Sequence, residues 1–488
     1  MGGANYLVLD QGSHASKALV FAADGRVIAS GEAPIRTHQP QPGWVEHDPD
    51  EIVASLHDAI AAALGAIEAG AAGFAAAGLA IQRSSIVCWD RENGAALSPV
   101  LSWQDRRNAD WLRAQQLDGD HLREITGLVA SPHYGASKLR WCLDHLPEVR
   151  RALAEGRLCC GPLASFVLHR LLDERPCLAD PANASRTLLW DVRAHDWSVE
   201  LLEACGIPRA CLPASVPSRH AFGTLVLGDC RVPLEVMTGD QPAALFAWGA
   251  PDAGTLFVNI GTGAFVQRVF AGEPPDAPGL LRGIAWQDAE RSIGVLEGTV
   301  NGAGAALAWL ANERGVAVEA LISGAARWLK KIHAPPLFIN GVGGLGAPYW
   351  VADCTARFSG AGGLAEETVA VLESIVFLLQ VNIEAIEAAS AAGAGAVRRI
   401  IVSGGVARLD GLCQRLADLA GVPVERPADI EATARGVAWL LGVRGAAGDG
   451  RSSRFVPRPD QVLRGRFVRW RAALEASVAG LVAAGREA

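Results

Sequence analysis

The chain lacks the features that mark a protein that binds nucleic acid. Its 488 residues contain 44 Lys and Arg against 52 Asp and Glu, which gives a formal net charge of -8 at pH 7, and no Lys/Arg-rich run occurs. Binding to a phosphate backbone needs a concentrated basic surface. We therefore expect no nucleic acid among its partners, and small-molecule chemistry instead.

Long apolar runs and export signals are missing as well. The longest uncharged stretch of low polarity, residues 69–81, is rich in Ala and Gly and is shorter than the roughly 20 residues that a membrane span needs. The N-terminus shows no basic segment followed by an apolar stretch and a cleavage site. These absences predict no membrane partner and a cytoplasmic location.

The ten cysteines form no CxxC pair and no cluster with His at the spacing of zinc ligands. Two of them, Cys159 and Cys160, are neighbours. We interpret all ten as reduced thiols, with no metal bound to sulfur.

The most informative pattern that is present occurs twice. An apolar strand leads into Asp10-Gln11-Gly12-Ser13, and a second one leads into Gly261-Thr262-Gly263. Glycine lets a backbone approach phosphate closely, while amides and a hydroxyl supply donors. Either turn alone also fits an ordinary hairpin. The pair, about half a chain apart, predicts two similar domains that face one nucleotide.

Strand and helix patterns alternate and predict an α/β fold. A helix is expected at 51–67, a buried strand at 78–82, the longest helix at 366–389 and a strand at 399–403. The pattern restarts near 248–254, where Pro and Gly cluster. We therefore expect an N-terminal domain at 1–248, a C-terminal domain at 249–445, and at 446–488 an extension whose terminal helix looks like an appendage.

Two aspartates stand beside predicted strand ends. Asp10 could hold magnesium through water, or it could cap a turn. Asp240 could be a helix N-cap, or a general base that accepts the proton of a substrate hydroxyl as that oxygen attacks the γ-phosphorus. Because an ordinary Asp has a pKa near ~3.9, the proton would move together with phosphoryl transfer.

Other residues leave alternatives open. Arg83 follows a strand end, where α/β proteins place ligands, and could donate to substrate hydroxyls. Trp103 could contact a carbon backbone or belong to the core. Residues 341–346 fit the GxGxxG pattern of dinucleotide sites, with Glu366 twenty residues on. Such a site requires a helix to begin there, and residues 347–350 do not open one, which weakens the alternative of an NAD-dependent dehydrogenase.

Taken together, the motifs resemble those of the FGGY carbohydrate kinases over residues 5–443, and most closely those of members that act on glycerol. The matching segments are Asp10-Gln11-Gly12-Ser13, Trp103-Gln104-Asp105-Arg106-Arg107, Asn183-Ala184-Ser185-Arg186-Thr187, Gly239-Asp240-Gln241, Gly261-Thr262-Gly263, Gly344-Leu345-Gly346-Ala347-Pro348-Tyr349-Trp350 and Ser403-Gly404-Gly405. The resemblance implies two ribonuclease-H-like domains of the actin and hexokinase type that close on ATP, Mg2+ and a small polyol or sugar. It also suggests a homodimer.

The resemblance further implies roles for single residues. Asp10 would serve magnesium, and Asp240 would serve the attacking hydroxyl. The nucleotide would be bound by Gly12, Ser13, His14, Lys17, Gly261, Thr262, Gly263, Gly304, Gly404, Gly405 and Leu409. The substrate would be bound by Arg83, Ser84, Trp103, His133, Asp240 and Gln241.

Two substrate positions depart from the pattern of the glycerol-binding members. Ser84 stands where Glu is expected, and His133 stands where Tyr is expected. A site that hydrogen-bonds hydroxyls loses discrimination when its partners are removed, and Ser in place of Glu also opens volume. We therefore expect a substrate other than glycerol, such as a longer polyol or a sugar. The alternatives are glycerol itself and a sugar-binding regulator with a degenerate kinase site.

On the nucleotide side, His14 replaces a hydroxyl residue, Lys17 replaces Arg, and Leu409 replaces an Asn near adenine. Lys17 can still meet a phosphate as a point charge. Leu409 fits an apolar adenine slot but removes a polar contact, which leaves the nucleotide preference open. The segment 223–239 is too short for the loop that binds a sugar bisphosphate regulator in some members, so we expect no such regulation.

Overall fold

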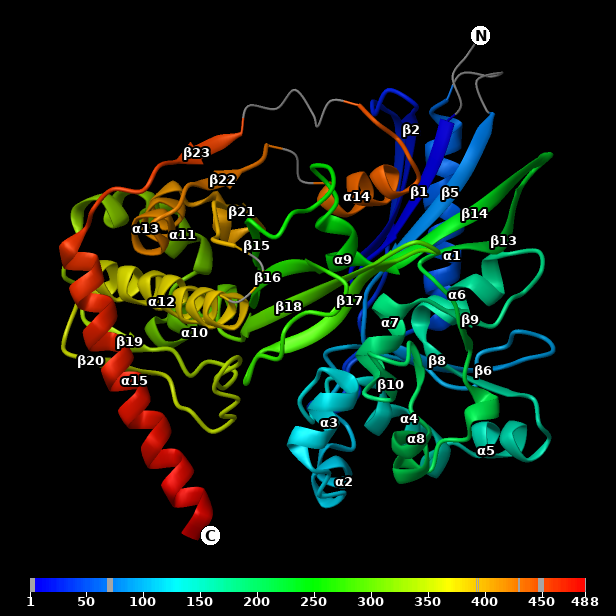
Figure 1. Cartoon of the computed structure of the whole chain (residues 1–488), viewed down its shortest axis with the longest axis horizontal. Helices are drawn as coiled ribbons and strands as arrows, with labels where there is room; N and C mark the ends of the chain where they lie inside the picture. The colour runs from blue at the N-terminus through cyan, green and yellow to red at the C-terminus, as the bar shows by residue number, and fades with distance from the viewer. Residues whose placement is uncertain are drawn as a thin grey trace.

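The computed structural model describes residues 5–67, 73–391, 393, 395–428, 431–445 and 452–487. Figure 1 shows the N-terminal half at the right, in blue to green, and most of the C-terminal half at the left, in green to red. The two halves meet in the middle of the view, near α9, β17 and β18.

The N-terminal half is built on a six-stranded sheet in the order β13-β14-β5-β1-β2-β3. Its strands are β1 (Asn5–Gln11), β2 (Ala15–Ala22), β3 (Val27–Pro34), β5 (Phe74–Ile81), β13 (Arg219–Leu227) and β14 (Cys230–Gly239). β1, β5 and β14 are parallel, whereas β2 and β3 run antiparallel to their neighbours. Parallel neighbours share a direction, so the carboxyl ends of β1, β5 and β14 lie at one edge of the sheet.

The C-terminal half repeats this arrangement in a sheet of the order β17-β18-β16-β15-β21-β22-β23. Its strands are β15 (Thr255–Ile260), β16 (Ala264–Ala271), β17 (Leu281–Gln287), β18 (Ser292–Val300), β21 (Arg399–Ser403), β22 (Val424–Arg426) and β23 (Ser453–Phe455). The series β18-β16-β15-β21-β22 corresponds strand for strand, with the same directions, to β3-β2-β1-β5-β14. The expected pair of ribonuclease-H-like α/β domains is thus confirmed.

A smaller sheet of the order β4-β7-β6-β8 belongs to the N-terminal half. Its strands are β4 (Glu46–His47), β6 (Ile86–Asp90), β7 (Val100–Leu101) and β8 (Leu158–Pro162). Three two-stranded pairs complete the strands, namely β9 (Leu178–Ala179) with β12 (Ala214–Ser215), β10 (Trp190–Asp191) with β11 (Asp196–Trp197), and β19 (Leu337–Ile339) with β20 (Arg357–Ser359).

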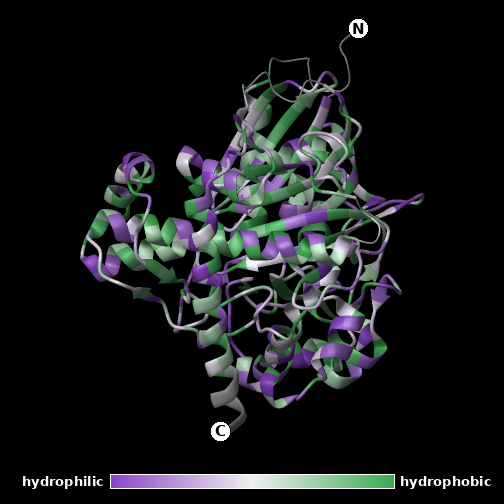
Figure 2. Cartoon of the chain, turned by 60° about the vertical axis from the view of Figure 1, so that its left-hand side comes forward, coloured by the Kyte–Doolittle hydropathy of each residue, from purple (hydrophilic) through white to green (hydrophobic). Residues whose placement is uncertain are grey.

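Helices cover these sheets, and around several of them Figure 2 shows green and purple alternating, as in helices with one buried face. The longer helices are α1 (Pro49–Gly65), α4 (Gly135–His145), α6 (Leu163–Leu171), α10 (Gly304–Arg314), α11 (Val318–Lys331), α12 (Leu364–Ser390), α13 (Asp410–Ala420), α14 (Ala432–Leu440) and α15 (Gln461–Glu487). The short ones are α2 (Ala109–Ala114), α3 (Gly119–Thr126), α5 (Pro147–Ala154), α7 (Pro181–Ala184), α8 (Val199–Cys205), α9 (Asp240–Ala244), η1 (Ser185–Thr187), η2 (Arg209–Cys211) and η3 (Val406–Arg408). The helices expected at 51–67 and 366–389 correspond to α1 and α12.

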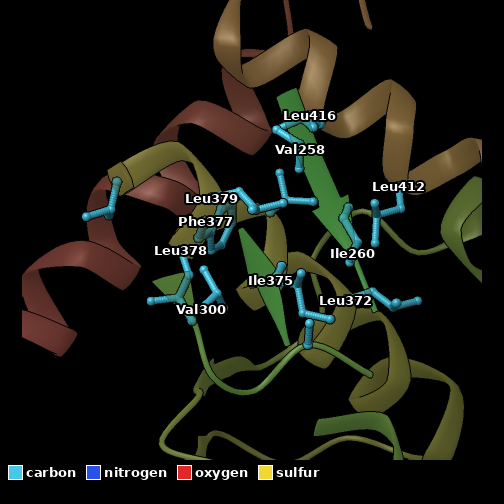
Figure 3. Packing of buried hydrophobic residues seen from close by; sticks show 14 of the residues in the cluster. Val258, Ile260, Val300, Leu372, Ile375, Phe377, Leu378, Leu379, Leu412 and Leu416 are labelled. Carbon is cyan, nitrogen blue, oxygen red and sulfur yellow. The ribbon is translucent and has the colours of Figure 1, made fainter. Parts of the chain in front are cut away.

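α12 forms the centre of the C-terminal core. Figure 3 shows Leu379 of this helix near Val258 of β15, and Ile260 of β15 near Leu412 of α13. By length and composition alone α12 could cross a membrane, but 89% of its apolar window is buried inside the fold. Because neighbouring elements already cover it, α12 is the core helix of a globular domain.

α14 lies between β22 and β23 of the C-terminal sheet in the chain but packs against β1 and β5 of the N-terminal sheet. Its Val437 fits over Gly78 of β5, where an added Cβ would come within 2.5 Å of Val437 Cγ1. The buried cluster at this place includes Val8 of β1 and Phe257 of β15. The two halves therefore share one apolar core beneath the cleft between them.

The segment that follows residue 445 is joined closely to the C-terminal half. β23 extends the large sheet, and Trp470 of α15 is fully buried and donates to the Phe338 carbonyl at 2.8 Å. Arg466 Nη2 lies 2.7 Å from Glu373 Oε2, and both side chains are buried. The first half of α15 is therefore part of the core, which differs from the expected appendage. Residues 446–451 and 488 lie outside the described residues.

The GxGxxG match at 341–346 forms a glycine turn and opens no helix. Gly343 and Gly344 have φ values of +73° and +74°, which glycine adopts readily. The next described helix, α12, begins only at Leu364. A dinucleotide site of the predicted kind requires a helix at the turn, so the structure contradicts the dehydrogenase alternative.

Candidate active site

Three predicted site residues meet at the carboxyl edge of the N-terminal sheet. Asp10 lies at the end of β1 and pairs with Ala80 of β5, while Ile81 pairs with Gly239 of β14. Arg83 follows β5 by two residues, and Asp240 follows β14 directly. The pairing of β1, β5 and β14 therefore brings Asp10, Arg83 and Asp240 to neighbouring positions at this edge of the sheet.

Asp10 lies opposite Lys17 in the β1–β2 hairpin. Burial and the negative charge of Asp240, opposed by the charge of Lys17, together raise the pKa of the Asp10 carboxyl to about 7. Two carboxylates that disfavour each other's charge suit a divalent cation, which prefers oxygen ligands and would relieve their repulsion. The residues present therefore fit a magnesium site.

Lys17 is engaged with the C-terminal half of the chain. Its Nζ donates to Glu431 Oε1 at 2.9 Å and to Glu431 Oε2 at 3.1 Å. Both side chains are about 30% exposed. The cation that the sequence suggested for a phosphate is thus held by a carboxylate from the opposite domain.

Asp240 is the first residue of α9, and Gly239 occupies the N-cap position instead. Its Oδ1 accepts from the Gln241 N–H at 2.8 Å. Burial raises the pKa of Asp240 above its ordinary value, and the nearby Arg83 guanidinium opposes the shift. A raised pKa makes this carboxylate a better proton acceptor than an ordinary aspartate.

A buried charge cluster joins the two domains beneath Asp240. Arg83 Nη2 donates to the Gln241 side chain and lies 3.5 Å from Glu297 Oε2. Glu297, on β18 of the C-terminal domain, also lies 3.1 Å from Arg186 Nη2 and accepts from Gln267 Nε2 at 2.7 Å. Although burial opposes its charge, Arg186 and Arg83 hold the pKa of Glu297 below its ordinary value. This ionised Glu297 fixes the Arg83 guanidinium at the cleft.

Gly239 allows Arg83 to lie where it does. A Cβ at Gly239 would come within 2.4 Å of Arg83 Cδ. The aliphatic part of Arg83 therefore crosses the backbone directly before Asp240, and any larger residue at 239 would displace it.

Lys138 connects the three segments around Ser84, Ser102 and His133, which carry predicted substrate residues and are called the substrate wall below. It is fully buried on α4, and its Nζ donates to the carbonyls of Ser84, Ser102 and His133 at 3.0, 2.7 and 2.8 Å. Ser84 has a φ of +62°, a left-handed conformation that is uncommon for serine. One ammonium group thus ties together three chain segments that carry predicted substrate residues.

Trp103 and His133 form an aromatic corner of this wall. Their ring centroids lie 5.7 Å apart in an edge-to-face arrangement. Burial lowers the pKa of His133 well below its ordinary value, and the Lys138 charge adds to the effect. The imidazole is therefore neutral at pH 7 and can both donate and accept hydrogen bonds.

The first phosphate-type turn is linked to this corner. Trp103 Nε1 donates to Ser13 Oγ at 2.9 Å, and Ser13 Oγ donates to Gln82 Oε1 at 3.3 Å. His14, the next residue, is exposed. The Ser13 hydroxyl therefore already joins the turn to the aromatic wall, and the Gly12 N–H closes the turn by donating to the Ala15 carbonyl at 3.0 Å.

The second turn follows β15 and is closely packed against two other glycines. The Gly304 N–H, at the start of α10, donates to the Gly261 carbonyl at 2.9 Å, and a Cβ at Gly304 would lie 2.7 Å from that oxygen. Gly404 has a φ of +95°, and a Cβ there would meet the Ile260 carbonyl oxygen at 2.4 Å. The tight contacts explain glycine at 304 and 404.

A cavity of about 700 Å³ lies between the domains. Its lining includes Asp240 and Gln241 on the N-terminal side, and Phe265, Gly404 and Gly405 on the C-terminal side. This volume is in the range of small-molecule sites. The cavity thus brings the predicted base together with Gly404 and Gly405, two of the predicted nucleotide residues of the C-terminal domain.

Most predicted nucleotide residues do not line this cavity. Leu409 belongs to the buried C-terminal core, and the neighbouring Arg408 lines the cavity instead. The lining also lacks the predicted nucleotide residues Gly12, Ser13, His14, Lys17, Gly261, Thr262, Gly263 and Gly304, the predicted metal residue Asp10, and the predicted substrate residues Arg83, Ser84, Trp103 and His133. The proposed adenine contact of Leu409 therefore finds no support in the position of its side chain.

Sequence reasoning assigned no role to Lys138, Glu297 or Glu431. Arg186 belonged to a matched motif, but its ion pair with Glu297 joins residues 111 positions apart. For Lys138 the sequence did hold a signal, because this residue falls on the same helical face as Gly135, Leu139 and Cys142, where an apolar side chain is expected.

Comparisons with known proteins agree with this geometry. Models of the N-terminal and C-terminal domains of the FGGY family of carbohydrate kinases match residues 5–247 and 256–444. A glycerol kinase of Alkalilimnicola ehrlichii is 38% identical over 90% of this chain and 91% of its own. A glycerol kinase of Thermus brockianus is 37% identical over 96% of this chain and 97% of its own.

Among solved structures, the Plasmodium falciparum glycerol kinase with ADP superposes with a TM-score of 0.87 at 21% identity, covering 98% of this chain and 99% of that one. A xyloylose kinase from Brucella ovis reaches a TM-score of 0.84 at 23% identity, with coverage of 97% and 99%. These two likenesses concern the fold. Matched by both domain models over most of its length, this chain belongs to the FGGY family of carbohydrate kinases, and it is a phosphotransferase.

Proposed function

We propose that this kinase transfers the γ-phosphate of ATP to a hydroxyl of a small polyol or sugar other than glycerol. The observation that carries the proposal is the position of Asp240. This half-buried carboxylate of raised pKa lines the cleft beside Gln241, and the Arg83 guanidinium is a neighbouring charge.

Asp240 acts as the general base. The substrate hydroxyl oxygen attacks the γ-phosphorus and its proton passes to the Asp240 carboxylate, while the bond from phosphorus to the ADP oxygen breaks. The products are a phosphate monoester and ADP, and the proton leaves Asp240 for solvent. Arg83, held by Glu297 and Gln241, orients the substrate hydroxyls by donating to them.

The nucleotide is bound between the two glycine turns. Backbone amides around Gly12 and around Gly261 to Gly263 donate to phosphate oxygens, and Lys17 supplies a positive charge once it leaves Glu431. Asp10 would hold Mg2+, which neutralises charge on the phosphates when it is bound.

The substrate wall argues for a ligand other than glycerol. Ser84 is shorter than Glu and uncharged, and it lies next to Arg83, so the wall is both wider and less negative than one with Glu at this position. His133 presents a neutral ring beside Trp103. A longer polyol or a sugar has the additional hydroxyls that these groups could bind.

Glycerol itself is the second candidate, because curated relatives at 34% to 38% identity carry the name glycerol kinase. The test is the rate of ADP release with ATP and Mg2+ over a panel of glycerol, tetritols, pentitols and ketoses. We expect a longer polyol or a sugar to exceed glycerol in kcat/KM. A glycerol value above all others would overturn the substrate proposal and leave the kinase assignment standing.

Asp240→Asn tests the chemistry in the same assay, with the exposed Asp110→Asn as the matched control. We expect the first variant to lose about 10²- to 10⁴-fold in kcat and the control to keep the wild-type rate. A full rate in Asp240→Asn contradicts the assigned base. Binding of a sugar by calorimetry without ADP release from any panel member would favour the regulator with a degenerate site.

A further inference from the structure

Six of the ten cysteines gather around β6, β8 and the segment before β9, namely Cys88, Cys142, Cys159, Cys160, Cys177 and Cys211. Cys159 and Cys160 are neighbours in β8, and successive side chains of a strand point to opposite faces. Cys160 pairs with Cys88 and lies in a fully buried cluster. Cys159 faces the other way, in a different core cluster, toward Cys177.

The Cys159 and Cys177 sulfurs are in direct contact. Their Sγ atoms lie 3.4 Å apart, and Cys177 is partly exposed. The Arg91 guanidinium, anchored by donating to the Ala210 carbonyl at 2.6 Å, places a positive charge near Cys159. The hydrogen bond from Cys177 and the charge of Arg91 lower the pKa of Cys159 to about 7 despite its burial. Such a pair holds a thiolate beside a thiol at neutral pH.

The backbone on both sides is already fixed. Cys159 pairs with Trp89 across β6 and β8, and the Ala214 N–H donates to the Cys177 carbonyl at 3.0 Å. A disulfide bond is about 2.05 Å long, so the sulfurs must approach by ~1.4 Å, a shift that side-chain rotation can supply. No rearrangement of the strands is required.

We propose that Cys159 and Cys177 form a redox modification site, which a peroxide converts to a disulfide. The Cys159 thiolate attacks hydrogen peroxide, the O–O bond breaks, and a Cys159 sulfenic acid forms while the released hydroxide is protonated to one water. The Cys177 sulfur then attacks the Cys159 sulfur and gives up its proton, and the hydroxyl of the sulfenic acid leaves with that proton as a second water. Two thiols are oxidised by two electrons and one peroxide is reduced to two waters.

The site borders the substrate wall on both sides. β8 ends at Pro162, and the next N–H, of Leu163, donates to the Ser85 carbonyl at 2.9 Å. Cys177 precedes by three residues Asp180, which caps α7 ahead of Arg186. A disulfide would therefore join two segments that lead to the Arg83–Glu297–Arg186 cluster.

Peptide mapping tests the proposal directly. The folded protein is treated with a few equivalents of hydrogen peroxide, blocked with N-ethylmaleimide, digested with trypsin and analysed by mass spectrometry. Trypsin releases 158–170 with Cys159 and Cys160, and 171–186 with Cys177, since Arg175 precedes a proline. We expect these two peptides to be linked, two hydrogens lighter than their sum, and to separate under a reductant.

Two variants assign the bond. Cys160→Ser is expected to keep the link at the wild-type yield, and Cys177→Ser is expected to lose it. Loss of the link in Cys160→Ser would place the bond on Cys160 and overturn the proposal. So would peroxide-treated wild type in which Cys177 carries a sulfinic acid while Cys159 remains free to alkylate.

Discussion

Lys17 Nζ donates to both oxygens of Glu431, at 2.9 and 3.1 Å, across a sequence separation of 414 residues. A cation beside the first phosphate-type turn is thus bound by a carboxylate that directly precedes α14. In the proposed nucleotide site, phosphate would compete with Glu431 for the Lys17 ammonium group, so breaking the Lys17–Glu431 contact would be part of the cost of binding ATP.

We expect Glu431→Gln to lower the KM for ATP, by up to ~5-fold, because a partly exposed ion pair contributes about 0–1 kcal/mol. Lys17→Met should raise that KM instead, since it removes the cation from both partners. Initial rates over a range of ATP concentrations check both variants. An unchanged KM for ATP in Lys17→Met would remove Lys17 from the nucleotide site.

Asp10 predicts a pH dependence of the enzyme. Its pKa is raised to about 7, so the carboxyl is protonated below that pH and ionised above it. A protonated carboxyl cannot serve a cation, and kcat/KM for ATP with Mg2+ should therefore fall about tenfold per pH unit below pH 7. A profile that stays flat down to pH 5.5 would contradict this assignment.

The same shift makes a prediction for stability. Because the folded-state pKa of Asp10 is raised, the stability that it contributes is present below the unfolded pKa and is lost as the pH rises through 7. Asp10→Asn should therefore melt at a higher temperature than wild type at pH 8, without metal or nucleotide. Thermal melts at pH 5 and pH 8 measure this, and the difference between the two proteins should shrink at pH 5.

From the contacts of Lys138 we predict that replacing it lowers both stability and substrate binding. Lys138→Met leaves three buried carbonyls without their donor, which should lower the free energy of unfolding by about 3 kcal/mol. The wall that carries Ser84, Trp103 and His133 should loosen, which raises the substrate KM more than the ATP KM. Lys330→Met, at an exposed position of α11, is the control and should leave both properties unchanged. Equal increases in the two KM values would argue for a merely structural role.

Ser84 predicts a change of specificity. Ser84→Glu returns a carboxylate to the position beside Arg83, and it should raise kcat/KM for glycerol relative to the best longer substrate by at least about tenfold. Ser84→Gln, of the same length but uncharged, separates charge from size and should give a smaller change. A lower preference for glycerol in Ser84→Glu would show that this position does not set the substrate.

The sequence by itself determined the local pattern of this protein. Apolar patterns and turn chemistry predicted the strand that leads into the turn at Asp10, the strand before Gly239-Asp240 and the strand at 399–403, because apolar runs and glycine turns are properties of neighbouring residues. A repeated strand and turn pattern likewise indicated two related domains. Candidate residues at strand ends, such as Asp240, followed from the same local reasoning.

Only the tertiary structure decided which of these groups act on one another. Glu297 reaches Arg83 and Arg186 from the other domain, Lys138 joins three separate segments, and Glu431 finds Lys17, since long-range contacts leave no periodic trace in the chain. The burial of Leu409 and of Trp470 likewise depends on partners far away in sequence. Burial and neighbouring charge also set the pKa of Asp10, and both exist only in the folded protein.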